Sequence, residues 1–87
     1  MPFYVYIAAN TDDEELYKGF SENPYVRIEA HNRGESKFTS TKRGWHLVFV
    51  QLFETKREAL IFEKKVKRLN RASLQRLIAS PQNSIRN

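Results

Sequence analysis

The feature that most restricts the fold of this chain is a run of nine residues, 45–53, with the sequence WHLVFVQLF. Apart from His46 and Gln51, every residue in the run is apolar, and several are β-branched or aromatic. Such a run predicts a β-strand, whose side chains alternate between the two faces of a sheet. Because both faces are mostly apolar, the sheet must be covered on both sides. A chain of 87 residues has room for one such core.

Two further strands and a helix are predicted before this run. Residues 3–8 and 16–20 are rich in aromatic and β-branched side chains, and the polar segment 10–14 between them predicts a hairpin with a long loop. Asn23 followed by Pro24 is typical of a helix start, so we expect a helix from residue 24 to residue 32 or 33.

Two helices are predicted after the strong strand. Thr55 and Glu58 fit a capping box, which begins a helix with an apolar stripe at Ala59, Phe62, Val66 and Leu69. Residues 72–79 predict a third helix that Pro81 ends. We expect one domain over residues 1–80 and a disordered tail over residues 81–87.

The predicted element order is β-β-α-β-α-α. It indicates an α/β (α+β) fold, with a small three-stranded, mostly antiparallel sheet flanked by three helices. The chain has no cysteine, which excludes disulfides, zinc–thiolate clusters and a cysteine nucleophile. No apolar run approaches the roughly 18 residues of a membrane span, so we expect a cytoplasmic protein with no membrane partner.

Charge is distributed unevenly along the chain. Residues 1–35 contain seven acidic and three basic residues, a net charge of −4, whereas residues 36–87 contain twelve basic and three acidic residues, a net charge of +9. This asymmetry favours a basic surface for a polyanion such as nucleic acid, although a solvated helix face would have the same composition.

Five residues form a candidate site. Tyr6 and Tyr17 lie on the two predicted hairpin strands. Arg27 and His31 are four residues apart, on one face of the first helix. Glu63 borders the apolar stripe of the second helix. Taken singly, each has an ordinary structural explanation, as a strand tyrosine, a surface pair or a salt-bridge partner.

Taken together, these residues resemble the GIY-YIG nuclease superfamily, and in particular its small stand-alone bacterial members. The matching segments are YVYI (4–7), LYKGFS (16–21), VRIEAHNRG (26–34), KFT (37–39), WHLV (45–48) and EALIFEKKVK (58–67). In this resemblance Tyr4 replaces the first glycine of the GIY motif, and Lys18 stands where an apolar residue is usual. If the Lys18 side chain points inward, the packing around Tyr17 comes into doubt.

The resemblance implies an endonuclease that uses a divalent cation, Mg²⁺ or Mn²⁺, with Glu63 as the metal ligand. It also implies a place in DNA repair or recombination. Tyr6, Tyr17, Arg27 and His31 match the other catalytic positions. A phenol with a reference pKa of about 10 needs assistance to activate water, from the cation or from a hydrogen bond to His31. Either tyrosine can fill this role, and Tyr6 is preferred.

Several basic residues are candidates for contacts with backbone phosphates. They are Lys37, Lys42, Arg43, Lys64 and Lys67. With no added recognition domain in the sequence, we expect DNA cleavage that is structure-directed or weakly sequence-selective, and RNA stays open as a substrate. A protein partner would supply targeting, and the sequence does not indicate an oligomeric state. The alternatives are a non-catalytic nucleic-acid-binding module on the same fold and a protein-interaction domain.

Overall fold

The structure, a computed structural model, describes residues 2–35 and 42–85. It contains the six elements that the sequence predicts, in the predicted order. They are β1 (Phe3–Asn10), β2 (Leu16–Ser21), α1 (Pro24–Asn32), β3 (Trp45–Phe53), α2 (Lys56–Val66) and α3 (Arg71–Ile78). The strands form one antiparallel sheet in the order β2-β1-β3, so the first strand lies in the centre. The predicted α+β fold is confirmed.

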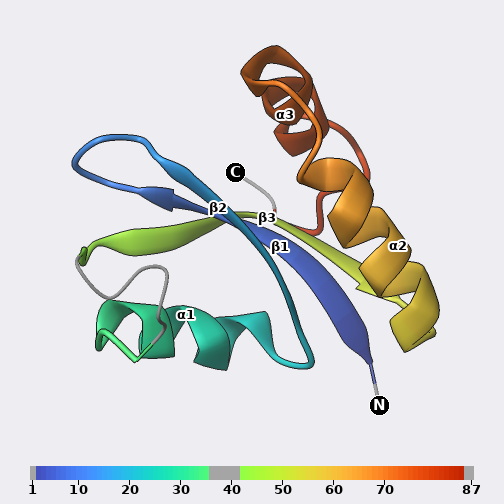
Figure 1. Ribbon diagram of the computed structural model, residues 1–87, viewed down its shortest axis with the longest axis horizontal. Helices are drawn as coiled ribbons and strands as arrows, with labels where there is room; N and C mark the ends of the chain where they lie inside the picture. The colour runs from blue at the N-terminus through green and yellow to red at the C-terminus, as the bar shows by residue number, and fades with distance from the viewer. Residues whose placement is uncertain (1, 36–41, 86–87) are drawn as a thin grey trace.

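Helices cover both faces of the sheet, as the apolar pattern of β3 predicts (Figure 1). On one face, Val5, Ile7 and Phe49 form a buried core with Ala59 of α2, and Val66 and Leu74 complete it. On the other face, α1 packs against the sheet through Ala30 and His31, next to Tyr6 and Trp45. Because neighbouring residues of β1 point to opposite faces, this one strand contributes to both layers.

Side chains at the helix starts explain where each helix begins. Asn23 Oδ1 accepts hydrogen bonds from the backbone N–H groups of Tyr25 and Val26, and Thr55 Oγ1 accepts one from Glu58. Both caps were predicted. Asn70 Oδ1 accepts from the Ser73 N–H and begins α3. Helix α2 ends at Val66, but Leu69 of the predicted apolar stripe still packs against the core from the turn that follows.

The segment after α3 differs from the prediction of a disordered tail. The Ser84 N–H donates to Val50 O over 2.8 Å, and Asn83 Nδ2 donates to Val48 O over 2.8 Å. Asn83 Oδ1 also accepts from the Val50 N–H. Residues 81–85 are thus held against β3, where they satisfy backbone groups on its outer edge, while residues 86–87 lie outside the described part of the chain. None of the described helices is both long and apolar enough to span a bilayer.

Candidate active site

Tyr6 lies at the middle of the central strand, on the face that α1 covers. Its side chain crosses over β2 at Gly19, the residue that pairs with it in the sheet. A Cβ atom at position 19 would lie 2.6 Å from both Cζ and Oη of Tyr6, closer than packed atoms approach. Gly19 is therefore required to make room for the Tyr6 ring.

The Tyr6 hydroxyl reaches His31 on α1. Tyr6 Oη and His31 Nε2 are 2.8 Å apart, and both side chains are buried from solvent. When the imidazole is neutral with its proton on Nδ1, the hydroxyl donates this hydrogen bond to Nε2. The helix that Asn23 and Pro24 begin thus presents a histidine to the centre of the sheet, as the family resemblance implies.

Burial determines the protonation of this pair. Burial lowers the pKa of His31 below its usual value, and the positive charge of Arg27 lowers it further. The pKa of Tyr6 is raised, first by burial and then by the charge of Tyr17, with a smaller rise from Glu63. Arg27 opposes this rise through its charge and a hydrogen bond. At neutral pH, His31 is thus a neutral acceptor and Tyr6 a neutral phenol.

Tyr17 packs against the same histidine from β2. The centroids of the Tyr17 and His31 rings are 4.8 Å apart in an edge-to-face arrangement, and those of Tyr6 and Tyr17 are 6.3 Å apart. Tyr17 is half-buried whereas Tyr6 is 1% exposed, so Tyr17 is the more accessible of the two phenols. The two motif tyrosines and the histidine therefore form one aromatic cluster beneath α1.

Arg27 and Glu63 supply the charges around this cluster. Arg27 lies one turn before His31 on α1, and both it and Glu63 act electrostatically on the Tyr6 hydroxyl. The Glu63 side chain is 18% exposed, and its Oε2 lies 3.7 Å from Nζ of Lys67, a long ion pair. The structure brings Tyr6, Tyr17 and His31 into contact and places Arg27 and Glu63 within electrostatic range of them.

Glu63 is the candidate metal ligand. Within residues 2–35 and 42–85, no group of three His, Asp or Glu side chains forms a metal cluster. A single carboxylate still fits Mg²⁺, which keeps several of its waters and needs few protein ligands. The weak pair with Lys67 leaves the carboxylate oxygens able to bind such an ion.

Asn32 and Trp45 are site residues whose role the sequence does not predict. Asn32 Nδ2 donates to Trp45 O over 2.9 Å, and the Trp45 N–H donates to Asn32 Oδ1 over 2.7 Å. The Trp45 ring also packs edge-on against Tyr17. This pair joins the end of α1 to the start of β3 and so holds the neighbouring His31 in place. In the sequence, the sign of this contact is an amide residue directly after His31. Helix periodicity does not identify the residue to which that amide binds.

The basic residues that were predicted to contact backbone phosphates lie in different surroundings. Lys42 Nζ contacts Asp13 Oδ2 at 2.5 Å and Glu15 Oε2 at 2.7 Å, so two carboxylates offset its charge. The Arg43 guanidinium packs beside Gly34 and donates to Lys42 O. Lys67 pairs with Glu63, as described above. Lys37 lies outside the described residues.

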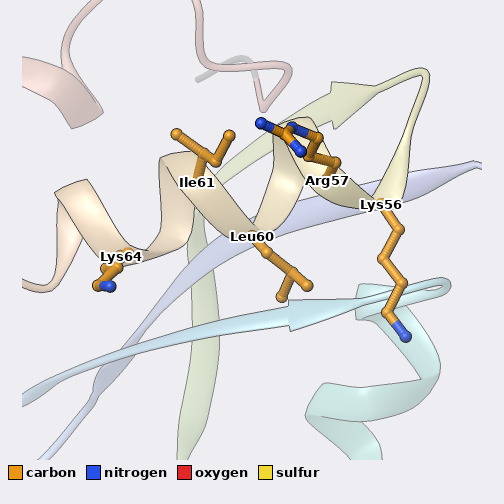
Figure 2. Close-up of a pocket in the computed structure, with 5 residues that line it drawn as sticks. All are labelled: Lys56, Arg57, Leu60, Ile61 and Lys64. Atoms are coloured by element: carbon orange, nitrogen blue, oxygen red, sulfur yellow. The ribbon is translucent and has the colours of Figure 1, made fainter.

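Lys64 belongs to an outer face of α2 that carries several cations. With Lys56, Arg57, Leu60 and Ile61 it lines a shallow pocket of about 550 Å³. Figure 2 shows Lys56, Leu60 and Lys64 on successive turns of α2, with Arg57 and Ile61 beside them. Ile61 is 59% exposed. Since this helix also carries Glu63, the basic face and the candidate metal ligand share one rigid element.

Comparisons with known proteins match this arrangement. The family described as the GIY-YIG catalytic domain matches residues 2–77. UPF0213 proteins from Staphylococcus aureus strains Mu50 and MW2 are 41% identical over 76 residues, which cover 86% of this chain and 92% of theirs. The solution NMR structure of a UPF0213 protein from Bacillus halodurans is similar with a TM-score of 0.62 and 30% identity, covering 97% of this chain and 89% of that one.

Proposed function

Because the chain belongs to the GIY-YIG catalytic domain family, we propose that it is an endonuclease that hydrolyses DNA phosphodiester bonds with the help of a divalent cation. The single observation that carries this proposal is the buried hydrogen bond between Tyr6 and His31, beside Arg27. A buried hydrogen bond between two titratable side chains can pass a proton, and a hydrolase needs a route for the proton of the attacking water.

Tyr6 and His31 together provide that route. Burial raises the pKa of the Tyr6 hydroxyl, so almost none of it is ionised to the basic phenolate at neutral pH. Tyr6 alone is therefore a poor base. In the relay, the Tyr6 oxygen accepts a proton from water while its own proton passes to His31 Nε2 over the 2.8 Å hydrogen bond. The resulting hydroxide attacks phosphorus, and the P–O bond to the leaving oxygen breaks. One proton enters the pair as another moves along it, so the phenol never becomes an isolated anion.

The charged residues would stabilise what this step produces. Negative charge builds on the phosphoryl oxygens, and Arg27 lies beside the hydroxyl that activates the water. Glu63 would hold the divalent cation, which polarises the phosphate and stabilises the leaving oxygen when it is bound. With no carboxylate cluster among the described residues, we propose one bound ion of Mg²⁺ or Mn²⁺.

The basic face of α2 supports a nucleic acid as the substrate. Lys56, Arg57 and Lys64 form a cationic surface on the helix that carries Glu63. Such contacts to phosphates carry little sequence information, so we propose structure-directed or weakly selective cleavage, with any targeting supplied by a partner protein.

A non-catalytic nucleic-acid-binding module is the second candidate. The observation in its favour is the burial of Tyr6, which is 1% exposed and would contact solvent water only after movement of its neighbours. In this case the aromatic cluster would serve only to hold α1 on the sheet.

The test is cleavage of labelled duplex, single-stranded, flapped and branched DNA with Mg²⁺ or Mn²⁺. We expect metal-dependent products from the wild type and a loss of at least about 100-fold in Glu63→Gln, the scale of removing one transition-state charge contact. Glu54→Gln, which changes an exposed glutamate just before α2, should cleave normally. Equal cleavage by Glu63→Gln would refute the assigned metal ligand. DNA binding without cleavage by any form would favour the binding module.

A further inference from the structure

The open edge of β2 contains a pocket that the proposed reaction does not use. It has a volume of about 460 Å³ and is lined by Glu15, Leu16, Tyr17, Lys18 and Lys67. Tyr17 and Lys18 are successive strand residues, so their side chains point to opposite faces of the sheet. A pocket that both of them line must wrap around the strand edge, and β2 is an edge strand of the sheet.

Lys18 is the unusual member of this pocket. It stands where the family resemblance leads one to expect an apolar residue, and it pairs with Ile7 of β1 on the face that α2 covers. The side chain is half-buried, and the described part of the chain provides no ion pair for it. A partly desolvated ammonium group without a counter-charge is unfavourable until an anion joins it.

The charges around the pocket favour an anion. Lys67 adds a second ammonium group, which lies 3.7 Å from the Glu63 carboxylate. The carboxylate of Glu15 also lines the pocket, and because it shares Lys42 with Asp13 its charge is only partly offset. Two lysines against one carboxylate leave the lining with a net positive charge, and one of these lysines is held only by a long ion pair.

The pocket also lies beside the candidate active site. Tyr17 belongs to the aromatic cluster with His31, and Lys67 is the ion-pair partner of Glu63. An anion held here would thus be a near neighbour of any phosphate bound at the cluster. In a nucleic-acid chain the anion next to one phosphate is another phosphate.

We infer that this pocket is a phosphate subsite, in which Lys18 and Lys67 bind a backbone phosphate adjacent to the one that is cleaved. The inference rests on the proposed function for its choice of ligand. Lysine suits such a contact because its ammonium group is a compact charge that needs no fixed approach direction. Lys18 is then a substrate-binding residue of this chain and not a defect in the motif.

The salt dependence of DNA binding tests this assignment. Fluorescence anisotropy with a labelled DNA duplex, in EDTA so that no cleavage occurs, gives the dissociation constant over a range of NaCl concentrations. Removal of one lysine that binds a phosphate makes the slope of log K against log salt shallower by about 0.9. We expect this change in Lys18→Gln and in Lys18→Leu, and the wild-type slope in Lys18→Arg, which keeps the charge.

Lys65→Gln is the matched control, because it removes the same charge from an exposed residue of α2 that does not line the pocket. It should alter the slope much less than Lys18→Gln. Lys18→Leu also separates binding from folding, since leucine suits a half-buried strand position and should leave the melting temperature unchanged or higher.

A wild-type slope in a stably folded Lys18→Leu would overturn the inference, and Lys18 would then serve only to prevent strand pairing at the sheet edge. Because this assay involves no cleavage, its result is independent of whether Glu63→Gln abolishes nuclease activity. The two proposals can therefore fail separately.

Discussion

Replacement of Gly19 by alanine tests how closely the strand backbone determines the position of the Tyr6 hydroxyl. The added Cβ would lie 2.6 Å from Cζ and Oη of Tyr6 and 2.9 Å from Cε2. Ordinary contacts between such atoms are longer by about 1 Å. Because Tyr6 is 1% exposed, its ring cannot shift without displacing the residues that cover it. Either the ring shifts away from His31, or β2 moves away from β1.

Each response has a cost that can be estimated. If the ring shifts by about 1 Å, the 2.8 Å hydrogen bond to His31 Nε2 breaks inside a buried cluster, which costs about 1–3 kcal/mol. If the strands separate, the strain of overpacking costs about 1–3 kcal/mol. Alanine is favoured over glycine within a strand by about 0.5–1 kcal/mol, which opposes either cost. We expect a net decrease of about 1–2 kcal/mol in the free energy of unfolding.

Urea denaturation of a double-mutant cycle measures this effect. In a Tyr6→Leu background the distal ring atoms are absent, so Gly19→Ala should become neutral or stabilising, a reversal of sign. In the wild-type background the substitution should also reduce DNA cleavage, because the proton relay needs the Tyr6–His31 contact. If Gly19→Ala destabilises both backgrounds equally, the Tyr6 ring is not what requires glycine here.

Three further substitutions test separate parts of the structure. Burial holds the pKa of His31 below its usual 6.5, so below pH 6.5 the unfolded chain binds more protons than the folded protein. The free energy of unfolding, measured by urea denaturation, should therefore fall as the pH decreases from 6.5. His31→Gln should remove this pH dependence, whereas the control His46→Gln, at an exposed position, should keep it. Asn32→Ala removes two hydrogen bonds to β3 and should lower the free energy of unfolding by about 1–3 kcal/mol in urea denaturation. Lys64→Gln should weaken DNA binding more than Lys42→Gln in anisotropy titrations, because Lys42 is already offset by two carboxylates.

Local patterns predicted most of the fold. The apolar run of β3, the Asn23–Pro24 helix start and the Thr55 cap all depend on residues within one turn or one strand, and the structure contains each of them. The prediction was wrong after α3, where Asn83 binds β3. That contact joins residues 33 positions apart in the sequence, and composition alone made the polar segment resemble a free tail.

The candidate site was predicted by the order of its motifs and not by its geometry. The contact between Tyr6 and His31 is implied by the resemblance, but the burial that shifts both pKa values depends on how α1 lies on the sheet. The pairing of Asn32 with Trp45 joins two elements across a loop, so no periodicity reveals it. Lys42 was predicted as a phosphate contact on charge alone, whereas the residues that it contacts, Asp13 and Glu15 in the loop between β1 and β2, are acidic.

The burial that holds Tyr6 and His31 together also limits when they can transfer a proton. Burial favours the neutral form of both groups, so the free protein contains a neutral phenol and a neutral imidazole. Transfer to His31 creates an imidazolium in a desolvated site, and the charge of Arg27 makes this less favourable. An anion beside the pair reverses this balance, because it attracts the imidazolium and offsets Arg27. In the proposed reaction, the phosphate of the DNA substrate would be such an anion. In the proposed reaction, water activation should therefore depend on substrate binding, and the relay should be inactive in the free protein.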